Sequence, residues 1–125
     1  MILDTNALSA LADGDARIGK VLRQQTRACL PVIVLGEFRY GIAQSRHRVD
    51  YEEWLQAQLR HFEILPVTDR TASAYAMLRV TLQQQGTPIP ANDAWIAALA
   101  LQHGLAVLSR DVHFDSVPQL VRRGW

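Results

Sequence analysis

Residues 91–104 read ANDAWIAALALQHG, a stretch of apolar and small residues that carries one carboxylate. Pro90 stands just ahead of it, Asn92 can cap its first turn, and Gly104 supplies a left-handed stop. The residues between are apolar or strong helix formers on nearly every face, which predicts a helix buried inside a layered domain. Asp93 falls in the first turn, where the positive end of the helix dipole favours an anion, so helix stabilisation alone can explain it.

The composition outside this stretch is that of one globular domain. The 125 residues are 49% hydrophobic and 20% charged, so we expect a single domain over residues 1–125. The net charge of +1 is weaker than a broad basic face for nucleic acid would give. Cys29, the only cysteine, lies in an apolar run and is expected to be a small core residue in a reducing compartment. No apolar run is long enough to span a bilayer, so we expect a cytoplasmic protein without a membrane partner.

Short apolar runs alternate with helical patterns along the chain. The runs that predict strands cover residues 1–3, 28–32, 63–67, 105–108 and 120–123. Helical periodicity recurs between the first four of them, and the helix expected at 33–45 carries an apolar stripe bordered by Glu37. This alternation predicts an α/β fold in which helices cover both faces of a parallel sheet of about five short strands.

Four acids fall at positions that such a sheet brings together. Asp4 ends the first strand, and Asp111 follows the strand at 105–108. Asp93 opens the buried helix, and Glu37 lies beside the apolar stripe of another. Parallel sheets bind ligands beyond the carboxyl ends of their strands, so we expect these carboxylates at one edge. Crowded carboxylates either take up protons or bind a cation, and a site made only of oxygen atoms suits Mg²⁺ or Mn²⁺.

Polar neighbours of these acids are expected to support the site. Thr5, Asn6 and Ser109 offer hydroxyl and amide groups that can orient the ligands of a metal ion. A metal ion held there would lower the pKa of a bound water and so provide hydroxide for in-line attack on a phosphodiester.

Asp115 is a competing candidate for the fourth acid. It lies four residues beyond Asp111 and follows Phe114, whose ring we expect to turn into the core. The chain should therefore have left the edge of the sheet by then, which favours Asp111 and predicts a turn or cap role for Asp115.

The remaining histidines and aromatic residues are interpreted as structural. The histidines at 47, 61, 103 and 113 show no metal-ligand spacing and have no cysteine partners, so we expect surface or helix-end positions and no zinc site. The tryptophans and tyrosines are scattered rather than interleaved with basic residues, which favours core or dimer contacts over stacking on RNA bases. The sequence contains no glycine-rich phosphate loop, which disfavours a nucleotide-binding module.

Four segments together carry a resemblance that covers essentially the whole chain. They are Leu3-Asp4-Thr5-Asn6, EFRYGI at 37–42, NDAWIAA at 92–98 and LSRDVHF at 108–114. In order, spacing and total length they resemble the PIN-domain ribonucleases, especially the toxins of VapBC toxin–antitoxin pairs. Only three residues precede Asp4, which a start codon placed slightly late would explain.

The resemblance implies a fold, an activity and partners. The fold is a three-layer α/β/α PIN-like domain with strand order 3-2-1-4-5. The activity is Mg²⁺- or Mn²⁺-dependent cleavage of RNA that leaves 5′-phosphate and 3′-hydroxyl ends. The partners are a second copy of the chain and a cognate VapB-type antitoxin that blocks the site. By position, the metal-binding and catalytic acids are Asp4, Glu37, Asp93 and Asp111, and the supporting residues are Thr5, Asn6 and Ser109.

One alternative function remains open at this point. A non-catalytic PIN-like module would bind its antitoxin and RNA without cleaving the RNA. The presence of all four acids favours the enzyme, and metal-dependent RNA cleavage by the purified protein separates the two.

Overall fold

A computed structural model describes residues 1–125 and contains a five-stranded parallel sheet in the order β3-β2-β1-β4-β5. The strands are β1 (Ile2–Leu3), β2 (Cys29–Pro31), β3 (Glu63–Leu65), β4 (Val107–Leu108) and β5 (Arg122–Arg123). The α/β class and the strand order 3-2-1-4-5 are therefore confirmed. All five strands are short, so the apolar faces of the helices contribute many of the residues of the hydrophobic core.

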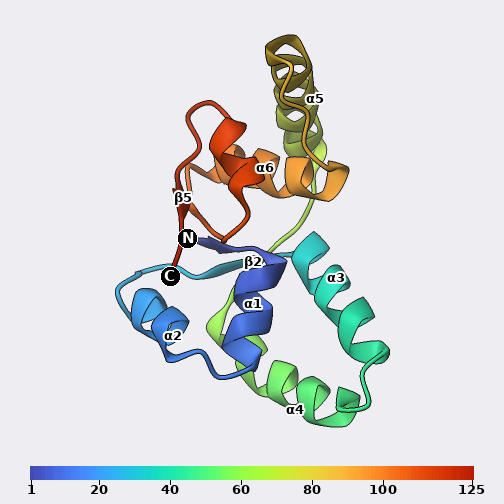
Figure 1. Cartoon of the computed structure of the whole chain (residues 1–125), viewed down its shortest axis with the longest axis vertical. Helices are drawn as coiled ribbons and strands as arrows, with labels where there is room; N and C mark the ends of the chain where they lie inside the picture. The colour runs from blue at the N-terminus through green and yellow to red at the C-terminus, as the bar shows by residue number, and fades with distance from the viewer.

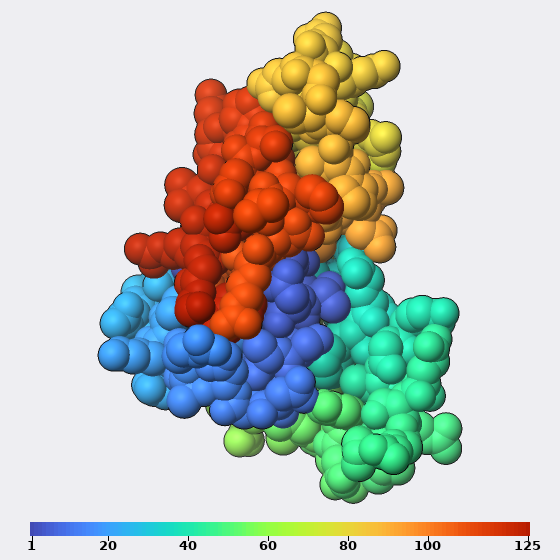
Figure 2. All heavy atoms as spheres, in the orientation of Figure 1, coloured from blue at the N-terminus to red at the C-terminus, as the bar shows by residue number.

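Six helices surround the sheet. They are α1 (Thr5–Ala12), α2 (Ala16–Arg23), α3 (Val32–Ala43), α4 (Arg48–Gln58), α5 (Asp69–Gln85) and α6 (Ala91–His103), with short 3₁₀ turns η1 (Leu59–His61) and η2 (Val112–Ser116). In Figure 1, α5 and α6 lie above the strands, while α1, α2 and α4 lie below them. The far end of α5 protrudes from the body of the molecule in Figure 2. No helix is both long and apolar enough to cross a membrane.

The helix α6 is buried as its composition predicts. Its residues 96–100 are at most 1% exposed, and Gly104 ends it with a φ of 65°. The expected cap is wrong, because the N-cap position is Pro90 and no side chain caps the helix. Asn92 lies inside the first turn and is exposed, so the cap position falls two residues earlier than expected.

The register of the two central strands places the ends of β1 and β4 side by side. Leu3 pairs with Leu108, and the Asp4 amide donates to the Leu108 carbonyl at 3.1 Å. The residues that follow the two strands, Asp4 after β1 and Ser109 after β4, therefore lie at the same edge of the sheet. Both of them are polar. Both are buried.

The outer strand β5 holds the segment after β4 in place. Arg122 donates to both carboxylate oxygens of Asp115, at 2.7 and 2.9 Å, and to the Ser109 carbonyl at 3.1 Å. The Arg122 side chain is largely withdrawn from solvent by these contacts and is only 23% exposed. Asp115 is likewise an ion-pair partner rather than a cap.

Phe114 is the residue by which η2 is anchored, and its ring is fully buried, as expected. Phe114→Ala should lower the free energy of unfolding by about 3–5 kcal/mol, because it removes a large buried side chain and leaves a cavity. Urea denaturation measures the change. Val112→Ala, at a 65% exposed position in the same turn, should change stability by less than about 0.5 kcal/mol. Equal losses in the two variants would contradict the packing described here.

Candidate metal centre

Asp4 is the most buried acid of the chain and lies where β1 ends and α1 begins. As the N-cap residue of α1 it accepts a hydrogen bond from the Thr5 amide at 2.7 Å. Its other carboxylate oxygen accepts from Ser109 Oγ at 2.7 Å and from Asn6 Nδ2 at 3.0 Å. Thr5, Asn6 and Ser109 therefore lie around Asp4, at the positions expected of supporting residues.

Burial raises the pKa of Asp4, and the nearby charges of Asp93 and Asp111 raise it further. The hydrogen bonds from Ser109 and Thr5 act in the opposite direction, because they favour the charged carboxylate. No cationic side chain acts on Asp4 itself to compensate its charge.

Asp93 and Asp111 act electrostatically on Asp4 and share a histidine. Nδ1 of His113 is 3.0 Å from Asp93 Oδ2 and 3.1 Å from Asp111 Oδ1. Hydrogen bonding to Asp93 and the negative charge of Asp111 raise the pKa of His113. Burial raises the pKa of Asp93, while its hydrogen bond to His113 opposes the change. An imidazolium here partly neutralises two acids.

Sequence reasoning missed the role of His113. Its side chain is 48% exposed, as expected of a surface residue, but its nitrogen, Asp93 and Asp111 place ligand atoms within 4.8 Å of one another. The missed signal is local, since Asp111 and His113 are two residues apart at the start of a 3₁₀ turn and Asp111 caps that turn. Long-range spacing rules for zinc sites do not detect such a pair.

Glu37 reaches the site from α3. Burial raises the pKa of Glu37, and the charges of Asp4 and Asp93 add to the shift, while side-chain interactions with Thr5 and Asn92 oppose it. The buried Glu37 Oε1 and Thr5 Oγ1 atoms make no hydrogen bond of good geometry, although the Thr5 side chain lies close enough to Glu37 to influence its pKa. Unpaired buried polar atoms are costly, so these two oxygens fit a site that receives a further ligand.

The donor set fits a hard divalent cation. The four predicted acids, Asp4, Glu37, Asp93 and Asp111, act on one another electrostatically at the edge where β1 and β4 end. Their oxygens suit Mg²⁺ or Mn²⁺, and such an ion would offset the burial and the mutual repulsion that raise the pKa values of Asp4, Glu37 and Asp93. Asp115 is not part of the group, because Arg122 holds it and keeps its pKa low.

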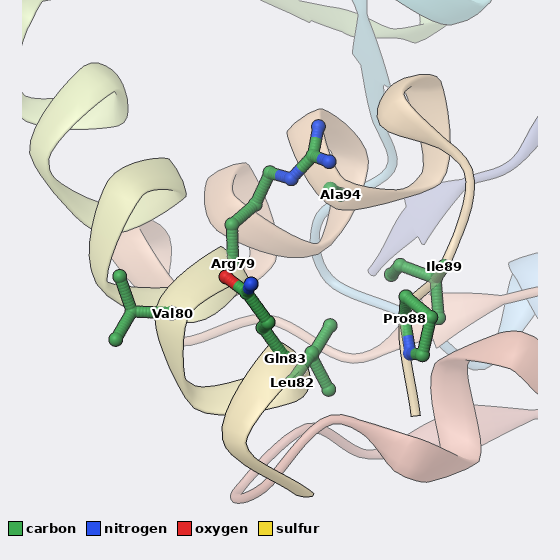
Figure 3. A pocket seen from close by; sticks show the side chains of 7 residues that line it. All are labelled: Arg79, Val80, Leu82, Gln83, Pro88, Ile89 and Ala94. Carbon is green, nitrogen blue, oxygen red and sulfur yellow. The ribbon is translucent and has the colours of Figure 1, made fainter. Parts of the chain in front are cut away.

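A separate cavity of about 360 Å³ lies between α5 and α6 and contains none of these acids. Figure 3 shows Arg79 extending along this cavity toward Ala94, the neighbour of Asp93. The Arg79 guanidinium donates to Tyr75 Oη at 2.7 Å, and Tyr75 stacks on Trp95 with ring centroids 3.8 Å apart. This column of side chains fastens α5 to α6 and so supports the helix that carries Asp93.

Comparison with known proteins decides the family. The sequence profile of the PIN domain matches residues 1–120. The chain belongs to the PIN-domain family. Within the family, it is 34% identical to the ribonuclease VapC4 of Mycobacterium tuberculosis over 91 residues, which are 71% of this chain and 70% of the relative.

Two further PIN-domain proteins cover more of the chain. The ribonuclease VapC5 of Mycobacterium tuberculosis is 32% identical, over 93% of this chain and 86% of its own length. The crystal structure of VapBC2 from Rickettsia felis, bound to a DNA fragment from its promoter, superposes with a TM-score of 0.88 at 25% identity. That match covers 99% of this chain and 97% of the other. The PIN-like fold therefore extends over the whole described chain.

The raised pKa values of this centre predict how stability depends on pH in the absence of metal. A carboxyl group whose pKa is raised on folding stabilises the folded state below its unfolded pKa, 3.8 for Asp, and this contribution is lost as pH rises through the folded pKa. The pKa of His113 is raised above 6.5, and its contribution is likewise lost at higher pH. In EDTA, the urea concentration at the midpoint of unfolding should therefore decrease as the pH is raised from about 5 to about 8.

The exposed ion pairs do not reverse this expectation. The arginine partners of Asp15, Glu63 and Asp115 lower the pKa values of these acids, so their stabilisation is already complete above pH 4.5. Glu37→Gln should make the urea midpoint decrease less steeply with rising pH, because it removes one of the crowded acidic groups. A midpoint that rises or stays constant over this pH range would contradict the crowded-acid description.

Proposed function

We propose that this chain is a metal-dependent endoribonuclease and the toxin of a type II toxin–antitoxin pair. The observation that supports the chemistry best is the convergence of Asp4, Glu37, Asp93 and Asp111 on one edge of the sheet, with two buried oxygens that have no partner. The ribonuclease names of the PIN-domain relatives support RNA as the substrate.

In this proposal the four acids hold one or two Mg²⁺ or Mn²⁺ ions. When bound, the cation supplies a water of lowered pKa and offsets negative charge on the phosphate. Asp4, fixed by Ser109, Asn6 and the Thr5 amide, is the rigid ligand of the site. Asp93 and Asp111 become available as ligands when the imidazole of His113 moves aside or changes partner.

The same acids explain how a partner could inhibit the enzyme. A cluster that attracts a cation also accepts a guanidinium or ammonium group, so a VapB-type antitoxin can block the site with an Arg or Lys side chain. The VapBC2 structure from Rickettsia felis supports a partner of this kind. We also propose a homodimer, for which the exposed Met77 and Val80 on α5 offer apolar contact surface.

The competing proposal is a PIN-like module that binds antitoxin and RNA without cleavage. It gives no role to the unpaired Glu37 and Thr5 oxygens. The following two experiments separate it from the enzyme.

Asp93→Asn should abolish metal-dependent RNA cleavage, because it removes a central ligand. In EDTA the variant should be as stable as the unmodified protein or more stable, because one unit of mutual repulsion disappears. The matched control is Asp69→Asn, which removes the first-turn acid of α5 at an exposed position. If Asp93 served only the helix dipole, the two variants would behave alike. Cleavage that survives both EDTA and Asp93→Asn would refute a metal-dependent site.

Asp111→Asn and Asp115→Asn test which late acid belongs to the site. Asp111→Asn should weaken Mn²⁺ binding and slow cleavage, though less than Asp93→Asn, because Ser109 and water can partly replace it. Asp115→Asn should leave cleavage near normal and lower only stability, since it loosens the ion pair with Arg122. Calorimetric Mn²⁺ titrations of both variants measure the difference. A larger loss of affinity in Asp115→Asn would show that the fourth acid is misplaced.

A further inference from the structure

A second cavity opens beside the acidic centre and has no assigned role. Its volume is about 320 Å³, and it lies between α1, α3 and α4. Figure 1 shows α3 beside α1, with α4 below both. The volume is near the lower end of the roughly 300–1,000 Å³ typical of small-molecule sites. It is suited to one small ligand group rather than a long segment.

The cavity shares two residues with the metal centre. Thr5 and Glu37 line it, and both also border Asp4. The two buried oxygens without partners, Thr5 Oγ1 and Glu37 Oε1, belong to these same residues. A group bound in the cavity would therefore lie directly beside a phosphate held at the acids.

The chemistry of the lining excludes a phosphate in the cavity itself. No lysine or arginine lines it, while Glu37 and Asp13 both do. Asp13 lies at the C-terminal end of α1 and accepts a hydrogen bond from Tyr51 Oη at 2.6 Å. Acceptor groups of this kind fit a neutral ligand that donates hydrogen bonds.

The remaining walls fit a flat, partly apolar ring. Phe38 and Ile42 contribute apolar surface, and Gly41 leaves room because it has no side chain. Nucleobases combine apolar faces with a polar edge, and adenine, cytosine and guanine carry an exocyclic amino group that donates hydrogen bonds. Uracil carries no such amino group and donates only through its single ring N3–H, which offers fewer donors to the acceptors of the cavity.

We propose that this cavity binds one amino-bearing nucleobase of the RNA, next to the phosphate at which the acids act. The inference rests on the proposed ribonuclease function and names a base-recognition subsite for it. Asp13 accepts from the amino group, and the apolar wall formed by Phe38 and Ile42 contacts a face of the ring.

Gly41→Leu is the direct test because it fills the cavity without disturbing the fold. A Cβ atom added at Gly41 meets no atom within 4 Å, so the helix accepts a side chain there. Gly36→Leu is the matched control, since it lies in the same helix, also meets nothing within 4 Å and does not line the cavity. Neither glycine has a positive φ, so neither substitution strains the backbone.

The first measurement is cleavage of RNA with random sequence, followed by sequencing of the ends. The unmodified protein and Gly36→Leu should share a preference for adenine, cytosine or guanine at one position beside the cut. Gly41→Leu should lose that preference and raise KM by about tenfold or more, with kcat and Mn²⁺ affinity unchanged. Unchanged KM and unchanged base preference in Gly41→Leu would overturn the inference.

The second measurement does not depend on cleavage. Fluorescence anisotropy in Ca²⁺ would compare binding of short oligomers of A, C, G and U to the three proteins. The base site is supported if the oligomer of U binds more weakly than those of A, C and G and if this difference disappears only in Gly41→Leu. That conclusion holds even if no RNA is cleaved, and in that case only the proposed function fails. Equal binding of all four oligomers by the unmodified protein overturns the base site. So does a Gly41→Leu variant that escapes inhibition by a partner protein while binding RNA normally, because the cavity would then belong to that partner.

Discussion

The burial of several carboxylates beside one another is the constraint on which this structure depends. Asp4 is 5% exposed and has no cationic side chain beside it, and the charges of Asp93 and Asp111 reach it. Three hydrogen bonds, from Thr5, Asn6 and Ser109, hold it in place despite the cost of burial. Burying these acids lowers the stability of the folded protein and yields a preorganised anionic site, which is typical of centres that bind a cation or a cationic group.

The parallel sheet is what makes this arrangement possible in a short chain. β1 and β4 are neighbours in register, so the residues after them arrive at the same edge without long loops. The buried helix α6 then delivers Asp93 to that edge at its first turn. Contacts farther away, such as the ion pair between Arg122 and Asp115, keep the segment that carries Asp111 against the sheet.

Much of this fold follows from the sequence, and the reasons differ between elements. Alternating strand and helix patterns predict the α/β class, but the strand order came from family resemblance, because periodicity alone does not set it. The hydrogen bond from Ser109 to Asp4 depends on the register of β1 and β4, which the sequence pattern does not specify. The Asn92 cap was wrong because Pro90 fixes the start of α6 two residues earlier. The sequence places His113 only at the surface, because its partner Asp93 lies on α6 and the fold alone brings the two side chains together.

Anomalous scattering from crystals soaked in Mn²⁺ tests the central claim most directly, since it locates the ion rather than its effects. The account predicts a manganese peak at ligand distance from the carboxylates of Asp4 and Asp93, with Glu37 or Asp111 completing the site directly or through water. It also predicts that the His113 imidazole no longer bridges Asp93 and Asp111 when the ion is bound. A site without manganese at saturating concentration, or manganese bound only at other surface acids, would contradict the account.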